Sequence, residues 1–141
     1  MVFIDANIFL EVELKQTRAE ECKRLLEFLE TSPLCAWTNS FLVYSMILTI
    51  QNKTKDNDKV RKFIKILNSY TGLGIFNPNL STIHEAVLLQ DKYQLDFDDA
   101  LVIASLNKLG ISRIVTFDSH FENIPSIRKI IPSKALIEIN G

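Results

Sequence analysis

Residues 1–10 read MVFIDANIFL, and this stretch sets the architecture expected for the whole chain. Val2 to Ile4 is a short apolar run, which indicates a strand buried in a parallel sheet. Asp5 follows at the carboxyl end of that strand, and residues 7–14 have the pattern of a short helix. Because Asp5 and Asn7 interrupt the apolar residues, the stretch is neither a signal peptide nor a membrane span. We therefore expect a soluble, cytoplasmic protein.

Further along the chain, short apolar runs alternate with segments of helical spacing. Strands are expected at residues 34–37, 75–76, 113–117 and 135–139, and helices are expected to begin near Thr17, at Asn39 or Ser40, before Val60, near Ser81 and near Phe97. Thr17 and Glu20 have the spacing of a capping box, and Gly110 is placed to end the helix that starts near Phe97. This alternation is typical of an α/β fold, an open parallel sheet with helices on both faces. A length of 141 residues fits one domain spanning residues 1–141.

The charge balance limits the kind of partner that the chain binds. Its 16 Lys and Arg residues and 17 Asp and Glu residues give a formal net charge of −1. Tight non-specific binding of nucleic acid requires a large positive charge, so the balance argues against that function. It is compatible with a nuclease, because bound metal ions neutralise phosphate in place of basic side chains. The two cysteines, Cys22 and Cys35, fit no metal-binding pattern and are expected to be free thiols in a reducing compartment.

Three aspartates from distant parts of the chain are predicted to meet at one edge of the sheet. Asp5 and Asp118 follow two of the expected strands, and Asp99 lies in the first turn of the helix that starts near Phe97. In open parallel sheets, ligands bind at the carboxyl ends of the strands, near a switch in strand order. Taken singly, each aspartate has a plainer explanation as a helix cap, a turn residue or a partner of a helix dipole. Together, three repelling carboxylates are most simply accommodated by Mg²⁺ or Mn²⁺, as in phosphodiester hydrolysis.

Three motifs in a fixed order carry a resemblance to a known family. The segments MVFIDANIFL, DFDDALVIASL and IVTFDSHF resemble the signature of the PIN domain family, in particular its VapC-like toxin ribonucleases. The resemblance implies a PIN-like fold, an acidic site for Mg²⁺ or Mn²⁺, and endoribonuclease activity in the toxin of a toxin–antitoxin pair. It also implies RNA as substrate, an antitoxin protein as partner and a homodimer. By their places in the motifs, the metal-binding and catalytic acids would be Asp5, Asp99 and Asp118, supported by Asn7 and Thr116, with Phe121 as the closing aromatic.

One position departs from the family pattern. The family places a Glu on the third helix, about one turn beyond its start, and Ser45 occupies that place in the segment TNSFLVYSMIL. Residues 38–50 contain no acidic side chain that replaces it. Three interpretations stay open: Ser45 binds metal through a water molecule, Asp96 or Asp98 supplies part of the missing charge, or the domain is degenerate. A degenerate PIN domain would bind RNA or a protein partner with little catalysis.

Other residues also have two interpretations each. The lysine-rich stretch 51–65 is the best candidate for a contact with RNA phosphates, but a solvated helix face has the same pattern. His120 follows Asp118 closely enough to contact a phosphate, or it faces solvent in a turn. The aromatic residues that would stack on bases, or pack in the core or in a dimer, are Trp37, Phe41 and Tyr44. A phosphatase or a DNA nuclease with a similar sheet-edge site is the remaining alternative.

Overall fold

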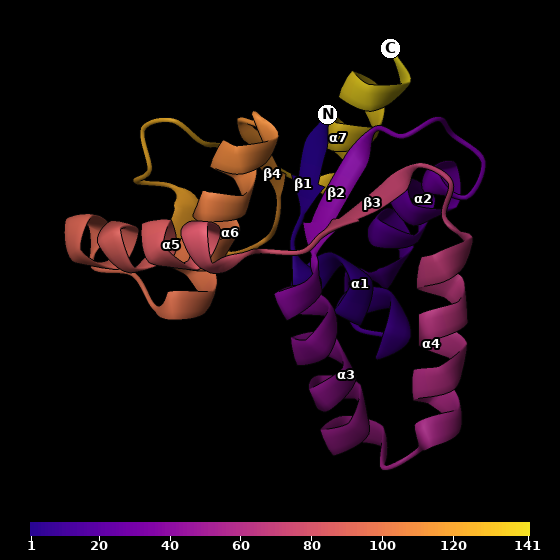
Figure 1. Cartoon of the computed structure of the whole chain (residues 1–141). Helices are drawn as coiled ribbons and strands as arrows, with labels where there is room; N and C mark the ends of the chain where they lie inside the picture. Colours follow the sequence, from indigo (N-terminus) through magenta and orange to yellow (C-terminus); the bar gives the residue numbers. More distant parts are fainter.

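In the computed structural model, which describes residues 1–141, a parallel sheet carries helices on both faces (Figure 1). The strands are β1 (Val2–Ile4), β2 (Ala36–Asn39), β3 (Leu73–Phe76), β4 (Arg113–Val115) and β5 (Arg128–Ile130). The helices are α1 (Ala6–Glu13), α2 (Ala19–Leu29), α3 (Ser40–Thr54), α4 (Asn57–Ser69), α5 (Leu80–Tyr93), α6 (Phe97–Leu109), α7 (Pro132–Asn140) and the short 3₁₀ helix η1 (Ser119–Phe121). This arrangement confirms the predicted α/β fold. No helix has both the length and the apolar character needed to cross a membrane.

The order of the strands creates one switch point in the sheet. The order is β3-β2-β1-β4-β5, and every neighbouring pair is parallel. Phe3 therefore lies opposite Trp37 of β2 on one side and opposite Ile114 of β4 on the other. The chain moves outward from β1 to β3 and then returns to the other side of β1 with β4. The carboxyl ends of β1 and β4 thus border the place where ligands bind in open parallel sheets.

Strand β1 is buried on both faces, because its side chains alternate between two cores. Val2 and Ile4 belong to a core built with α1, α2, α4 and α7, whereas Phe3 belongs to a core built with α6. Figure 1 shows the corresponding layers, with α5 and α6 on one side of the strands and α1, α2 and α4 on the other. All three strand residues are fully buried. Burial on both faces explains why the strand is a continuous apolar run rather than an alternating one.

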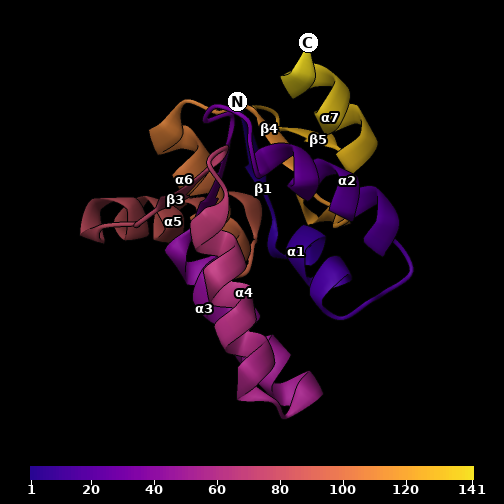
Figure 2. The same cartoon turned by 90° about the vertical axis from the view of Figure 1, so that its right-hand side faces the viewer.

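Helix α3 begins at the carboxyl end of β2, at the predicted cap. The side chain of Asn39 accepts a hydrogen bond from the backbone N–H of Leu42 at 2.8 Å and donates one to the Ser105 hydroxyl of α6 at 3.1 Å. This capping interaction fixes the start of α3 against α6. From there α3 and α4 form a hairpin that extends away from the sheet (Figure 2).

The strand predicted at residues 135–139 is wrong, since this segment belongs to α7. Pro132 stands in the first turn, where its fixed φ favours a helix. Ala135 is buried, and Leu136 and Ile139 pack against the core beneath, at helical spacing. The fifth strand is instead β5, which the sequence conceals because Arg128 and Lys129 make it look polar. Charged side chains are common on edge strands, which must resist pairing with other chains.

The capping box predicted at Thr17 and Glu20 is also absent. Helix α2 begins at Ala19, and Arg18 occupies the cap position without a side-chain hydrogen bond. The backbone N–H of Arg18 donates instead to the carboxylate of Glu11 at 2.8 Å. A residue of the preceding helix therefore takes over part of the capping.

Candidate acidic active site

The carboxyl ends of β1 and β4 open into a cavity of about 210 Å³. Its lining comes from the end of β1 and from α1, α3, α6 and the segment after β4, and consists of Asp5, Ala6, Asn7, Leu10, Leu42, Ser45, Asp98, Asp99, Val102 and Asp118. The three aspartates predicted to converge, Asp5, Asp99 and Asp118, thus line one cavity. The switch in strand order brings them together, because it places the ends of β1 and β4 beside the start of α6.

Asp5 is held rigidly at the end of β1. One of its carboxylate oxygens accepts a hydrogen bond from the Ala6 backbone N–H at 2.8 Å, and the other accepts one from the Thr116 hydroxyl at 2.8 Å. Burial raises the pKa of Asp5 above its ordinary value, and the hydrogen bonds from Thr116 and Ala6 oppose this shift. Asp5 is therefore both the cap of α1 and a wall of the cavity, so the two interpretations of this residue are compatible.

Thr116 connects the two strand ends. Its hydroxyl donates to Asp5 and accepts hydrogen bonds from the Asn7 side-chain amide at 3.1 Å and from the Asp118 backbone N–H at 3.0 Å. Asn7 also lies 3.5 Å from the second carboxylate oxygen of Asp5. Thr116 itself is fully buried. The orientations of Asp5, Asn7 and the turn carrying Asp118 are consequently fixed by a single side chain.

Asp99 and Asp118 are joined by a histidine. The Nδ1 atom of His120 lies 2.9 Å from Asp99 Oδ2 and 3.2 Å from Asp118 Oδ2. Burial and the neighbouring Asp98 raise the pKa of Asp99 to about 6, although His120 opposes the shift. The negative charges of Asp118 and Asp99 raise the pKa of His120 in turn. The imidazole therefore lies between two of the predicted acids, although 56% of its side chain is exposed to solvent.

The remaining predicted site residues divide into those inside the cavity and one beside it. Asp98 and Ser45 both line the cavity, and Ser45 is exposed. Asp96 lies in an adjoining hollow that also contains Asp99 and His120. Carboxylate oxygens of Asp96, Asp98 and Asp99 lie within 4.8 Å of one another. Asp98 therefore places a fourth carboxylate in the cavity that Ser45 also lines.

The cavity suits a hard divalent cation. Its carboxylates come from three parts of the chain, and oxygen ligands are those that Mg²⁺ and Mn²⁺ prefer. The side-chain oxygen of Asn7, which also lines the cavity, is buried without a hydrogen-bond partner. A buried amide oxygen of this kind is normally satisfied, and in this cavity it is a further oxygen ligand available to a cation. The residues present thus fit Mg²⁺ or Mn²⁺.

Comparison with known proteins identifies the family of the chain. A family model of the PIN domain matches residues 2–127. The chain belongs to the PIN domain family. A search of curated protein sequences gives no match for this PIN domain. Among solved structures, it is similar to VapC20 of Mycobacterium tuberculosis, described as a sarcin-ricin loop cleaving toxin, with a TM-score of 0.71 and 19% identity over 89% of this chain and 95% of that one.

Two further similar structures are toxin–antitoxin complexes. VapBC2 of Rickettsia felis, bound to a DNA fragment from its promoter, gives a TM-score of 0.72 with 16% identity over 93% of this chain and 98% of that one. A toxin–antitoxin complex from Klebsiella pneumoniae gives a TM-score of 0.67 with 19% identity over 94% and 98%. At such low identity these structures establish the fold that the PIN domain shares with them.

Sequence reasoning missed one polar contact and the apolar part of the site. It did not place His120 against Asp99, which is distant in the chain. The only available signal was that His120 follows Asp118 by two residues. At that spacing, a short helical turn brings the imidazole back over the Asp118 carboxylate. It also missed the apolar walls of the cavity, Leu10, Leu42 and Val102. Such residues look like ordinary core positions in the sequence.

Proposed function

We propose that this PIN domain is a cytoplasmic, metal-dependent endoribonuclease and the toxin of a toxin–antitoxin pair, acting as one domain over residues 1–141. The observation that carries the proposal is the convergence of Asp5, Asp99 and Asp118 on one cavity at the switch point of the sheet. The similar structures support the toxin assignment, since two of them are toxin–antitoxin complexes and another is a toxin described as cleaving the sarcin-ricin loop.

In this proposal Asp5, Asp99 and Asp118 hold the metal and form the catalytic centre. Bound Mg²⁺ or Mn²⁺ supplies Lewis-acid chemistry for phosphodiester hydrolysis. Thr116 and Asn7 keep the Asp5 carboxylate in one orientation, as the partners of metal ligands commonly do. The apolar walls Leu10, Leu42 and Val102 limit the water that reaches the acids from the protein side.

Chelation of divalent metal provides the direct test of this function. Single-stranded RNA is expected to be cleaved in the presence of Mn²⁺, and EDTA is expected to stop the reaction, because the acids alone repel the phosphate. Parallel assays with DNA of the same sequence and with a phosphomonoester separate a ribonuclease from a DNA nuclease or a phosphatase. RNA cleavage that persists in EDTA would contradict the proposed mechanism.

The proposal requires an antitoxin protein as a partner. It also includes a homodimer, in which a second copy of the chain is the partner. Exposed apolar side chains on α3 and α5 support the homodimer. These side chains belong to Tyr44, Leu48, Leu80, Val87 and Leu88. Tyr44 also lines an apolar hollow of about 180 Å³ together with Ile83 of α5, so the two sets are neighbours. An apolar surface of this kind marks an interaction site.

Introducing a charge on this surface should separate the dimer. Leu88→Glu is expected to give a monomer, because a carboxylate cannot be buried unpaired in an interface. Light scattering during gel filtration measures the mass. Ile137→Glu is the control, since Ile137 is exposed on α7, away from α3 and α5. A wild-type chain that is monomeric at all accessible concentrations would exclude the homodimer.

Ser45 supports a second candidate function. A neutral hydroxyl stands where the family pattern has a Glu, which would weaken metal binding. A degenerate PIN domain would then bind RNA or a protein with little cleavage. Asp98, which lines the same cavity, favours the active enzyme because it restores the number of carboxylates.

A further inference from the structure

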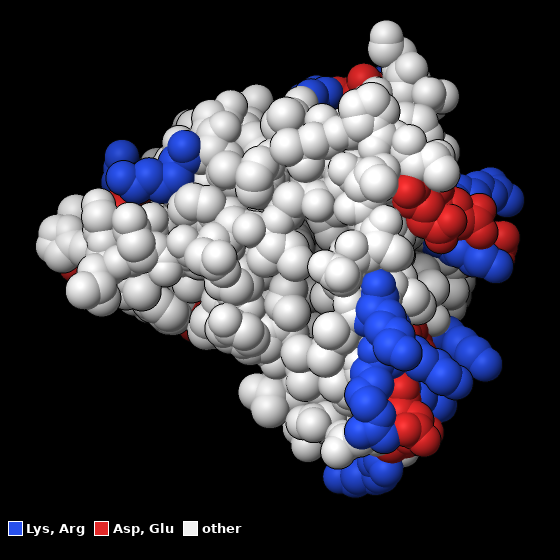
Figure 3. Space-filling model, turned by 45° about the vertical axis from the view of Figure 1, so that its right-hand side comes forward, with Lys and Arg blue, Asp and Glu red and all other residues white.

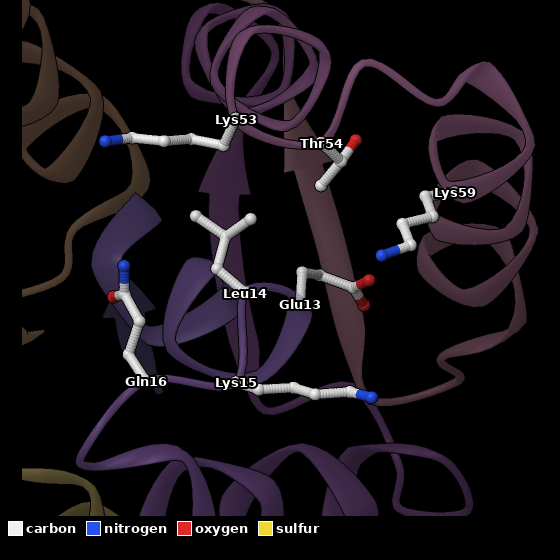
Figure 4. Close-up of a pocket in the computed structure, with 7 residues that line it drawn as sticks. All are labelled: Glu13, Leu14, Lys15, Gln16, Lys53, Thr54 and Lys59. Atoms are coloured by element: carbon white, nitrogen blue, oxygen red, sulfur yellow. The ribbon is translucent and has the colours of Figure 1, made fainter.

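A second hollow lies at the far ends of α1 and α3, where α4 begins. It encloses about 300 Å³ and is lined by Glu13, Leu14, Lys15, Gln16, Lys53, Thr54 and Lys59. Figure 4 shows Lys15 and Lys59 extending on either side of the Glu13 carboxylate. Lys53 extends away from them, toward the opposite side of the hollow (Figure 4). The hollow, which we call the lysine hollow, thus carries positive charge on two sides.

The charge of the lysine hollow is only partly neutralised within the protein. Glu13 is the only acidic residue in its lining, and Lys15, Lys53 and Lys59 form no ion pair within 4.0 Å. Figure 3 shows basic side chains, with a few acidic ones among them, gathered over α4 and the end of the α3–α4 hairpin. Further exposed lysines of these elements are Lys55, Lys62 and Lys65. A chain with a net charge of −1 therefore concentrates free positive charge at one place.

Two helices connect the lysine hollow with the acidic cavity. On α1, Leu10 lines the cavity and Leu14, four residues on, lines the hollow. On α3, the corresponding residues are Ser45 and Lys53. At a rise of 1.5 Å per residue, the two sites lie roughly 6 to 12 Å apart along the helices. That separation corresponds to roughly two to four nucleotides of stacked strand at about 3.4 Å each.

We infer that the lysine hollow binds the phosphate backbone of single-stranded RNA, a few nucleotides from the bond that is cleaved. The inference rests on the proposed ribonuclease function, which requires RNA to reach the acidic cavity. Lysine ammonium groups bind phosphate as mobile point charges and do not select a base. With Lys53 on one side and Lys15 and Lys59 on the other, the hollow contacts successive phosphates. The lysine hollow thereby offsets the repulsion between the RNA phosphates and the carboxylates of the acidic cavity. This explains how a chain without net positive charge holds its substrate.

RNA binding without cleavage tests the inference. Fluorescence anisotropy of a labelled single-stranded RNA is measured over a range of salt concentrations, in the Asp99→Asn background so that the strand stays intact. Lys53→Gln combined with Lys59→Gln is expected to weaken binding roughly 10- to 30-fold at about 0.1 M salt and to lower the salt slope by about 1.4, since each contact with a single strand contributes about 0.7. The matched control, Lys108→Gln with Lys134→Gln, removes the same charge from exposed positions on α6 and α7 and should bind as the background does.

The outcomes separate this inference from the proposed function. Equal RNA affinity of the two double variants would overturn the inference, even if the wild-type chain cleaves RNA. Weaker binding of the Lys53 and Lys59 variant alone would support it, even if the wild type does not cleave RNA and the nuclease proposal fails. A labelled poly-glutamate peptide serves as a probe for an acidic protein partner. If the Asp99→Asn protein binds this peptide more tightly than RNA, and the Lys53 and Lys59 variant no longer binds it, the inference is overturned in favour of such a partner.

Discussion

Replacing Asp99 by asparagine is expected to abolish RNA cleavage and, in the absence of metal, to make the protein more stable. The carboxylate of Asp99 lies in the cavity with Asp5, Asp98 and Asp118, and all of these charges repel one another. An amide keeps the shape of the side chain but is a poor ligand for Mg²⁺ or Mn²⁺. We expect the rate of cleavage to fall by at least about 100-fold, the upper range seen when the surroundings of a metal site are altered.

The gain in stability follows from the pKa of Asp99. The fold raises this pKa from 3.8 to about 6, so the folded protein retains a proton that the unfolded chain has lost. Stability from this group is therefore present at low pH and is lost as the pH rises through the folded value. At about pH 7.5 the ionised carboxylate destabilises the fold, by about 1 kcal/mol after allowance for solvent screening. The Asp99→Asn substitution would remove that cost, and Tm would rise by roughly 2–4 °C.

Cleavage rates and melting curves at about pH 5 and about pH 7.5 measure both effects. The gain in Tm should be smaller at the lower pH, where Asp99 of the wild type is protonated. Asp91→Asn is the matched control, because Asp91 is an exposed acid of α5 outside the cavity. Expression of the wild-type chain in a bacterial host should arrest growth, and the Asp99 variant should not. Retention of cleavage near the wild-type rate would exclude Asp99 from the catalytic centre.

Ser45→Glu is expected to increase metal affinity by about 10- to 100-fold and to increase cleavage at limiting metal concentration. Ser45 is exposed in the wall of the cavity, so a longer side chain can extend there without being buried. The added carboxylate also increases repulsion in the cavity. The variant should therefore melt at a lower temperature in EDTA and show a larger rise in Tm when Mn²⁺ is added.

Asn52→Glu provides the control for Ser45→Glu. It adds the same charge to an exposed position of α3, two turns beyond Ser45 and outside the cavity. If Ser45→Glu leaves both the metal-induced change in Tm and the cleavage rate unaltered, Ser45 does not stand for a missing ligand. Strong cleavage by the wild type would then point to Asp98 as the residue that replaces the lost charge.

The parts of the fold that are predictable depend on local signals. Helix α6 is predictable from Phe97 to Leu109 because Gly110, with a φ of +69°, ends it in the left-handed conformation. Asn39 is predictable as a cap of α3 because its type favours that position. In contrast, β5 and α7 depend on tertiary contacts. Three residues with two charges become a strand only because β4 offers an open edge.

The candidate site was predictable to a similar degree. The positions of Asp5 and Asp118 followed from the parallel sheet alone, since each aspartate comes after a strand. The contact of His120 with Asp99 was not predictable, because it depends on how η1 turns the chain above α6. That Asp98 lies inside the cavity, with Asp96 beside it, depends on the rotation of the first turn of α6, which no pattern in the sequence reports.

The Thr116 hydroxyl has a consequence for how activity arises during folding. It reaches Asp5 only when β1 and β4 are paired in their native register, because a slip of one residue would shift Thr116 along Asp5's strand by about 3.3 Å. These strands are separated by more than a hundred residues of chain, so their pairing needs nearly all of the protein to have been synthesised. A nascent chain that ends before β4 therefore lacks the contact between Thr116 and Asp5, so the proposed acidic centre can assemble only after most of the protein has been synthesised.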